Sequence, residues 1–153
     1  MRDETLSYSL RNCDETKGTV VREDGDLKAI LLKKRIRYSN PIGFDTKTGS
    51  GIYELLVLTH EGKKVGGVLH CPHTDVHFHV FKQYRNKGYL SRLIRDGFLK
   101  SLWPDVTTCT IVNIEEYERI EHLITIAGFS VHEDSVKAHE RELERLRSLY
   151  EQA

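Results

Sequence analysis

The chain has 153 residues, 39% of them hydrophobic and 30% charged, which is typical of a single globular domain spanning residues 1–153. Lys and Arg together number 23, as do Asp and Glu, and this balance argues against nucleic acid or a membrane surface as a partner. Three widely spaced cysteines predict no disulfide framework, and the N-terminal residues contain no apolar leader segment, so we expect a cytoplasmic protein.

The segment 1–51 has the weakest pattern of the chain. Apolar residues near helical spacing predict a helix that begins after Asp24 or Asp26 and ends in the basic run Lys33–Arg37. These apolar residues are Leu27, Ile30, Leu31 and Tyr38. The Pro, Gly, Asn and Asp residues of segment 39–51 then predict a surface loop.

Three strands in a meander are predicted next. Segments 51–60 and 64–71 are apolar runs joined by a tight turn, which is typical of a β-hairpin. Segment 75–81 alternates apolar and polar residues, which predicts a third strand with His77 and His79 on one face.

The C-terminal half alternates helices and strands. The predicted elements are a helix over 88–103, a strand over 106–112, a helix over 115–127, a short strand over 129–131 and a surface helix over 135–153. Leucines spaced by three make the last helix a candidate surface for a partner, including a second copy of the chain in a homodimer. Together the elements predict an α+β domain with one mostly antiparallel sheet.

The turn after the third strand has the residues of an anion site. The strand ends at Phe81, and Arg85, Lys87 and Gly88 precede the next helix, whose first turn contains Ser91. The first N–H groups of a helix have no partner within the helix, and the helix dipole adds partial positive charge there. Such a turn suits phosphate, whereas the plainer interpretation is an ordinary loop with solvated basic side chains.

The stretch Arg85–Leu90, Arg-Asn-Lys-Gly-Tyr-Leu, resembles the pyrophosphate signature Q/R-x-x-G-x-G/A of the GNAT N-acetyltransferase superfamily. The order of elements over residues 52–131 is similar as well. The resemblance implies a sheet with helices on both faces and an acetyl-CoA cleft between two splayed parallel strands, here 75–81 and 106–112. It also implies direct transfer of the acetyl group to a small-molecule or peptide amine.

The resemblance assigns the cofactor to residues on both sides of this turn. The main chain before the turn would face the pantetheine arm, and the turn itself would hold the pyrophosphate. By name, these residues are Phe78, Val80, Phe81, Arg85, Asn86, Lys87, Gly88, Tyr89, Leu90 and Ser91. Asn113 either contacts the pantetheine arm or caps a helix. The basic run Lys33–Arg37 has two interpretations: its side chains are solvated at a helix end, or they attract an acidic acceptor or the 3′-phosphate of CoA.

Two positions depart from the family pattern. Leu90 stands where the signature ends in a small residue, so its side chain either crowds the phosphates or points into the core. Ile124 stands where many members have the tyrosine that protonates the leaving thiolate. Tyr117, two helical turns earlier, is the candidate general acid, with a water molecule as the alternative.

Histidines near the expected thioester are candidates for the proton acceptor that amine acetylation requires, because imidazole accepts protons near neutral pH. His79 and His77 are the first candidates, His70 ends the neighbouring strand, and Glu54 is a carboxylate alternative. The competing interpretation is that these side chains pack on the sheet as satisfied polar groups.

The same histidine pair also suits zinc or iron if a third ligand is close, with His70, Cys71 or His73 as candidates. The sequence supplies no second ligand cluster at a recognisable spacing, so no metal is predicted. The expectation is therefore an acetyl-CoA-dependent N-acetyltransferase. The alternatives are a non-catalytic acyl-CoA-binding module on the same fold and a metalloenzyme built on the histidine strand.

Overall fold

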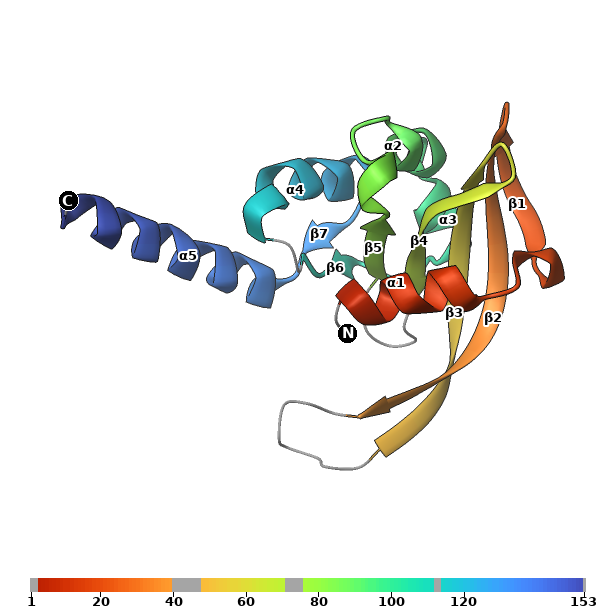
Figure 1. Cartoon of the computed structure of the whole chain (residues 1–153), viewed down its shortest axis with the longest axis horizontal. Coiled ribbons are helices and arrows are strands. Elements are labelled where there is room, and N and C mark those ends of the chain that lie inside the picture. The colour runs from red at the N-terminus through yellow and green to blue at the C-terminus, as the bar shows by residue number, and fades with distance from the viewer. Residues whose placement is uncertain (1–2, 40–47, 71–75, 112–113, 153) are drawn as a thin grey trace.

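The computed structural model describes residues 3–39, 48–70, 76–111 and 114–152 (Figure 1). Within these ranges one seven-stranded sheet has its strands in chain order. The strands are β1 (Thr19–Asp24), β2 (Leu27–Ser39), β3 (Thr48–His60), β4 (Lys63–His70), β5 (Val76–Val80), β6 (Thr108–Cys109) and β7 (Ser130–Val131). The helices are α1 (Asp3–Asn12), α2 (Tyr89–Ile94), α3 (Phe98–Leu102), α4 (Tyr117–Ile126) and α5 (Glu133–Glu151), with short 3-10 turns η1 (Glu15–Lys17), η2 (Lys82–Tyr84) and η3 (Ile114–Glu116).

Strands β1 to β5 form an antiparallel meander, which confirms the predicted α+β class and mainly antiparallel sheet. The hairpin β3–β4 and the third strand β5 lie where the sequence predicts them. At the turn between β3 and β4, Glu61 and Gly62 both have positive φ, at 52° and 79°. Two residues of this kind match the right-handed twist of the strands that they join.

The helix predicted after Asp26 is wrong, because this segment is strand β2. Leu27 and Ala29 belong to the core on one face of the sheet, and Ile30 and Leu32 pack with the core on the other face. Both faces of β2 are covered, so apolar residues follow one another without the polar alternation that marks a half-exposed strand. A short apolar run of this kind fits a helical period equally well.

The helix predicted over 88–103 is two helices, α2 and α3. Asp96 and Gly97 separate them with left-handed backbone, at φ 64° and 70°. The left-handed region is costly for residues that have a Cβ, and no helix continues through two such residues. The apolar stripe predicted for this helix still packs against the core on both sides of the break, with Leu93 and Ile94 before it and Phe98 and Leu102 after it.

The C-terminal strands pair in parallel and are shorter than predicted. β6 covers Thr108 and Cys109 rather than all of 106–112, and β7 pairs with it. The predicted helices α4 and α5 are confirmed. Gly128 (φ 89°) donates to the Thr125 carbonyl, and Phe129 donates to the Ile124 carbonyl. These two bonds form a Schellman motif, which ends α4 and turns the chain into β7.

Helices cover both faces of the sheet (Figure 1). Helix α1, which the sequence did not predict, packs Leu6 and Leu10 against one face. Helices α2, α3 and α4 pack against the other face, where Trp103 and Phe129 join the core. Burying a leucine stabilises the fold by roughly 2 kcal/mol, so α1 is firmly attached by its two leucines. Among the described residues no helix has both the length and the apolarity needed to cross a bilayer.

Candidate functional site

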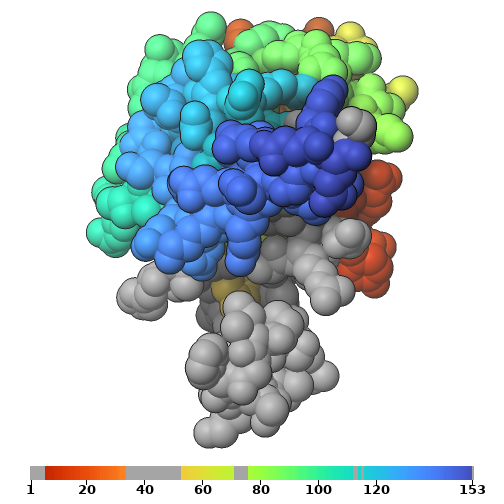
Figure 2. Space-filling model, turned by 90° about the vertical axis from the view of Figure 1, so that its left-hand side faces the viewer, coloured from red at the N-terminus to blue at the C-terminus, as the bar shows by residue number. Residues whose placement is uncertain are grey.

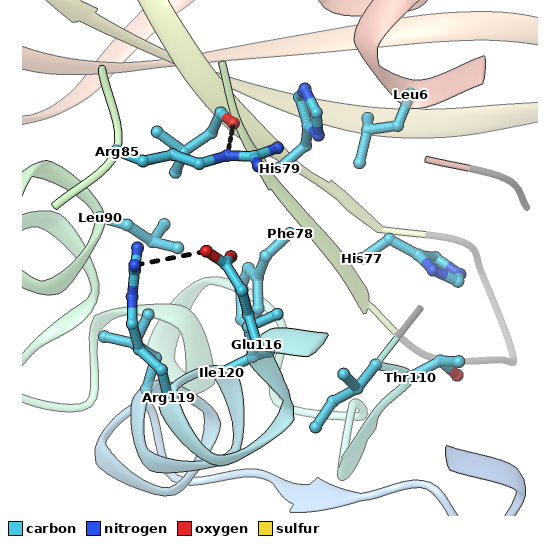
Figure 3. Close-up of a pocket in the computed structure, with 13 residues that line it drawn as sticks. Leu6, His77, Phe78, His79, Arg85, Leu90, Thr110, Glu116, Arg119 and Ile120 are labelled. Carbon is cyan, nitrogen blue, oxygen red and sulfur yellow. Dashed lines mark hydrogen bonds and ion pairs between the residues drawn. The ribbon is translucent and has the colours of Figure 1, made fainter. Parts of the chain in front are cut away.

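Strands β5 and β6 form an open pair of parallel strands. Their pairing in the described residues is limited to Val76 with Cys109, at the first residue of β5. Beyond this point residues 77–80 and 110–111 line a pocket between the two segments (Figure 3). The pocket has about 740 Å³ of space, including its open mouth. Its other walls come from α1, the turn after η2, α2 and the η3–α4 segment, through Leu6, Arg85, Leu90, Glu116, Arg119, Ile120 and Leu123.

The edge of β5 that faces this pocket has main-chain groups directed into it. The Phe81 N–H donates to the Val65 carbonyl of β4 at 2.9 Å. Neighbouring residues of a strand direct their N–H and C=O groups to opposite edges, so those of Phe78 and Val80 point away from β4 and toward the opening. The Val80 carbonyl accepts a hydrogen bond from Arg85 Nε at 2.9 Å.

The side chains of β5 divide between the two faces of the sheet. Phe78 and Val80 pack with the core beneath α2 and α4. His77 and His79 lie on the face of α1, as predicted for residues that share one face of a strand, and both line the pocket. His79 is 8% exposed, and its ring contacts the ring of Phe81 edge-on at 5.6 Å. The structure thus brings both candidate proton acceptors to the pocket wall.

The turn after β5 exposes main-chain donors. Asn86 and Gly88 have left-handed backbone, at φ 65° and 74°, with Lys87 between them. A turn that contains left-handed residues can gather N–H groups on one side of the chain. In the described part of the chain, no acceptor contacts the N–H groups of residues 86–91, and the first N–H of α2 with a main-chain partner is that of Arg92, which donates to the Gly88 carbonyl.

Basic side chains gather around this turn. A second pocket lies over it and shares Val80, Arg85, Leu90, Arg119 and Leu123 with the first, so the two pockets are adjacent. His122 and Arg119 of α4 form its far wall. Arg119 contacts the Asn86 side-chain oxygen and lies 3.6 Å from the Glu116 carboxylate (Figure 3). Arg119 and His122 could not be selected from the sequence, because Asn86 precedes Arg119 by 33 residues and His122 reaches the turn only through the packing of α4.

The two bulky residues after Gly88 leave the turn open. Leu90 is 7% exposed and packs in the core, and it also lines both pockets. Tyr89 stacks on His60 at 4.6 Å, and its hydroxyl lies 3.3 Å from His60 Nδ1. Ser91 lines the second pocket. The side chains therefore anchor α2 to the sheet while the main chain of the turn faces solvent.

No family model, curated protein or solved structure matches this chain. The chemistry of the site therefore has to be argued from its geometry.

Three predicted site residues lie away from the pocket. Phe81 is buried on the face of α1 under the guanidinium of Arg11, at 4.2 Å from the ring centroid, and its N–H is bonded to β4. Glu54 lies on β3, where it accepts a hydrogen bond from the Trp103 indole. Tyr117 stacks on His139 of α5, with ring centroids 4.1 Å apart. Burial, with smaller contributions from the charges of Glu121 and Glu140, raises the pKa of the Tyr117 phenol.

Asn113, Cys71 and His73 lie outside the described residues, so the predictions that name them stay predictions. Within the described ranges, no three His, Cys, Asp or Glu side chains are grouped closely enough to hold a metal ion.

His70 gives the fold an expected pH dependence. Burial lowers the pKa of its imidazole below the usual 6.5, and the Glu54 carboxylate 3.8 Å away opposes this only in part. The unfolded chain therefore binds more protons at this residue than the folded chain does at mildly acidic pH. By linkage, His70 contributes stability at pH values above 6.5 that is lost as the pH falls through the folded-state pKa.

We expect the His70→Gln variant to lose less stability than the wild type between pH 7.5 and pH 5.5. Urea denaturation at the two pH values measures the difference. The wild type, measured at the same two pH values, is the reference. An unchanged slope in His70→Gln contradicts the assignment.

Proposed function

We propose that this chain binds acetyl-CoA along the opening between β5 and β6 and transfers the acetyl group to a primary amine. The observation that carries the proposal is the adjacency of two features: an opened pair of parallel strands, and a basic turn with exposed main-chain donors at one end of the opening. A long ligand with a diphosphate at one end and a neutral amide-containing arm at the other fits both.

The basic turn supplies the affinity. The N–H groups of residues 86–91 lie at the border of a pocket whose walls carry Arg85, Arg119 and His122. Successive N–H groups in a turn can form an anion-binding concavity, and guanidinium groups strengthen it through paired hydrogen bonds. Helix α2 has only six residues, so the donors and the arginines, rather than a long helix dipole, account for phosphate binding.

The opening supplies the position of the thioester. The N–H and C=O groups of Phe78 and the N–H group of Val80 lie at the open edge of β5 and can pair with the amides of a pantetheine arm as a neighbouring strand would. The Val80 carbonyl is already bonded to Arg85. A donor at the same edge polarises the thioester carbonyl when the amine attacks. The ammonium first passes one proton to His79 or His77, which gives the neutral amine. The nitrogen–carbon bond then forms and the carbon–sulfur bond breaks, and the second proton lost by the nitrogen passes through water to the leaving thiolate.

A non-catalytic acyl-CoA-binding module is the second candidate. It is favoured by one observation, which is that Tyr117 is turned toward α5 and supplies no acid to the pocket. Binding without turnover would be the result of this arrangement.

Two measurements with the full chain test the proposal. Calorimetric titration with acetyl-CoA should give one site with an affinity on the order of micromolar. A thiol reagent should then detect free CoA when acetyl-CoA is mixed with a panel of primary amines, peptides and polyamines among them. Binding without thiol release from any amine supports the second candidate, and the absence of binding at millimolar acetyl-CoA overturns both.

A further inference from the structure

Helix α5 leaves the body of the molecule with apolar side chains exposed along its length. Figure 1 shows the helix projecting from the sheet, with the C-terminus far from the rest of the fold, and Figure 2 views the molecule from that side. Of this fully described helix only Ser135 is buried. Leu143, Leu146, Leu149 and Tyr150 are 48%, 44%, 53% and 85% exposed. Apolar exposure concentrated on one element in this way marks an interaction surface.

Except for Leu149, these exposed residues lie on a coiled-coil seam that also includes Val136 and the partly buried His139. Val136, His139, Leu143, Leu146 and Tyr150 are alternately three and four residues apart, which is the a/d spacing of a left-handed helix pair. We call these five residues the α5 seam. A seam of this spacing is matched by a second helix that carries the same spacing.

The α5 seam borders a groove that can hold such a helix. The groove lies between α5 and the η3–α4 segment and has about 1720 Å³ of space, including its open side. His139, Leu143 and Leu146 line it from α5, and Tyr117 lines it from α4. Two turns of helix, about 11 Å long and 10 Å across, occupy roughly 850 Å³, so the groove is large enough.

We propose that the occupant is α5 of a second copy of this chain, running antiparallel. When Leu143 of one copy faces Leu146 of the other, Tyr150 faces His139, and Glu140 faces Arg147 across the seam. A two-fold axis repeats each of these contacts, so the pair contains two Glu140–Arg147 contacts of opposite charge.

Charge selects this register over its neighbours. A shift of one heptad in one direction places Glu140 opposite Glu140, and a shift in the other direction places Arg147 opposite Arg147. Like charges at these flanking positions disfavour a register. A parallel pair would put the bodies of both copies at the same end, on the side where His139 already packs on its own Tyr117. The antiparallel pair places the two bodies at opposite ends.

The pair also adds a wall to the candidate cofactor site. Glu116 and Arg119 line both the α5 groove and the pocket between β5 and β6. In the proposed register Tyr150 of the second copy lies over the Tyr117–His139 stack, next to these two residues. The dimer itself does not depend on acetyl-CoA binding, so its test is independent of the proposed function.

Sedimentation of the full chain tests the proposal. The wild type should be mostly dimeric at about 100 µM and dissociate on dilution. Leu143→Glu should be monomeric, and its circular dichroism should match the wild type because the side chain is already half exposed. Glu140→Arg and Arg147→Glu should each raise the dimer dissociation constant roughly tenfold, and the double variant Glu140→Arg/Arg147→Glu should restore it. Glu144→Arg, the same change on the outer side of the helix, is the matched control.

Any of the following results overturns the proposed antiparallel dimer. If the chain is monomeric at every concentration, a second copy does not occupy the groove. A dimer that survives Leu143→Glu uses another face. Single charge variants that behave like Glu144→Arg, or a double variant that does not recover, exclude the antiparallel register.

Discussion

The Arg119→Glu variant should bind acetyl-CoA at least tenfold more weakly than the wild type. Arg119 contacts the Asn86 side chain in the turn after β5, and it lines both the pocket at that turn and the pocket between β5 and β6. Replacing a cation with an anion beside a diphosphate removes an attraction and adds a repulsion, and charge-assisted contacts of this kind are the strong ones. Calorimetric titration of both proteins with acetyl-CoA measures the change.

Two variants separate the charge of Arg119 from its shape. Arg119→Lys keeps the charge and loses the planar group that contacts Asn86, so we expect an intermediate loss. Arg141→Glu makes the same charge change at an exposed position of α5 that lines none of the pockets around the turn, and its affinity should stay at the wild-type value. Equal affinities for Arg119→Glu and Arg141→Glu would contradict the phosphate site.

Features set by neighbours in sequence were the ones that could be predicted. The β3–β4 hairpin follows from two apolar runs around a glycine turn, and the shared face of His77 and His79 follows from the period of a strand. The place of the turn at Gly88 follows likewise from the change of period after Phe81. Each of these signals lies within about ten residues, so no tertiary contact is needed to read it.

Features set by packing could not be predicted. Strand β2 was mistaken for a helix because α1 and α2–α4 bury both of its faces, and a two-sided burial erases the alternation of polar residues. The role of Arg119 depends on where α4 lies relative to the turn at Asn86, and no local pattern encodes that. Tyr117 faces α5 because His139 stacks on its ring, which fixes the rotation of α4.

The Gly66→Ala variant should lose about 1–3 kcal/mol of stability and also bind acetyl-CoA more weakly. A Cβ at Gly66 in β4 lies 2.3 Å from the His79 carbonyl oxygen and 2.8 Å from the Val80 Cα. Alanine within a strand normally gains up to ~1 kcal/mol over glycine, but the contacts here are main-chain atoms of β5 that no rotamer change can move. Overpacking costs about 1–3 kcal/mol, so the clash outweighs the entropic gain.

The same displacement reaches the site, because the residues pushed by the new Cβ belong to the wall of the pocket between β5 and β6. Urea denaturation gives the free energy of unfolding, and calorimetry gives the acetyl-CoA affinity. Gly25→Ala, in the turn between β1 and β2, is the control: its φ is 63° and its Cβ would contact nothing within 4 Å. That change should cost about 1 kcal/mol and leave the affinity unchanged. A Gly66→Ala variant as stable as the wild type would mean that β4 and β5 can move apart to make room for the Cβ. In that case β5 would not be the rigid pocket wall that positioning the thioester requires.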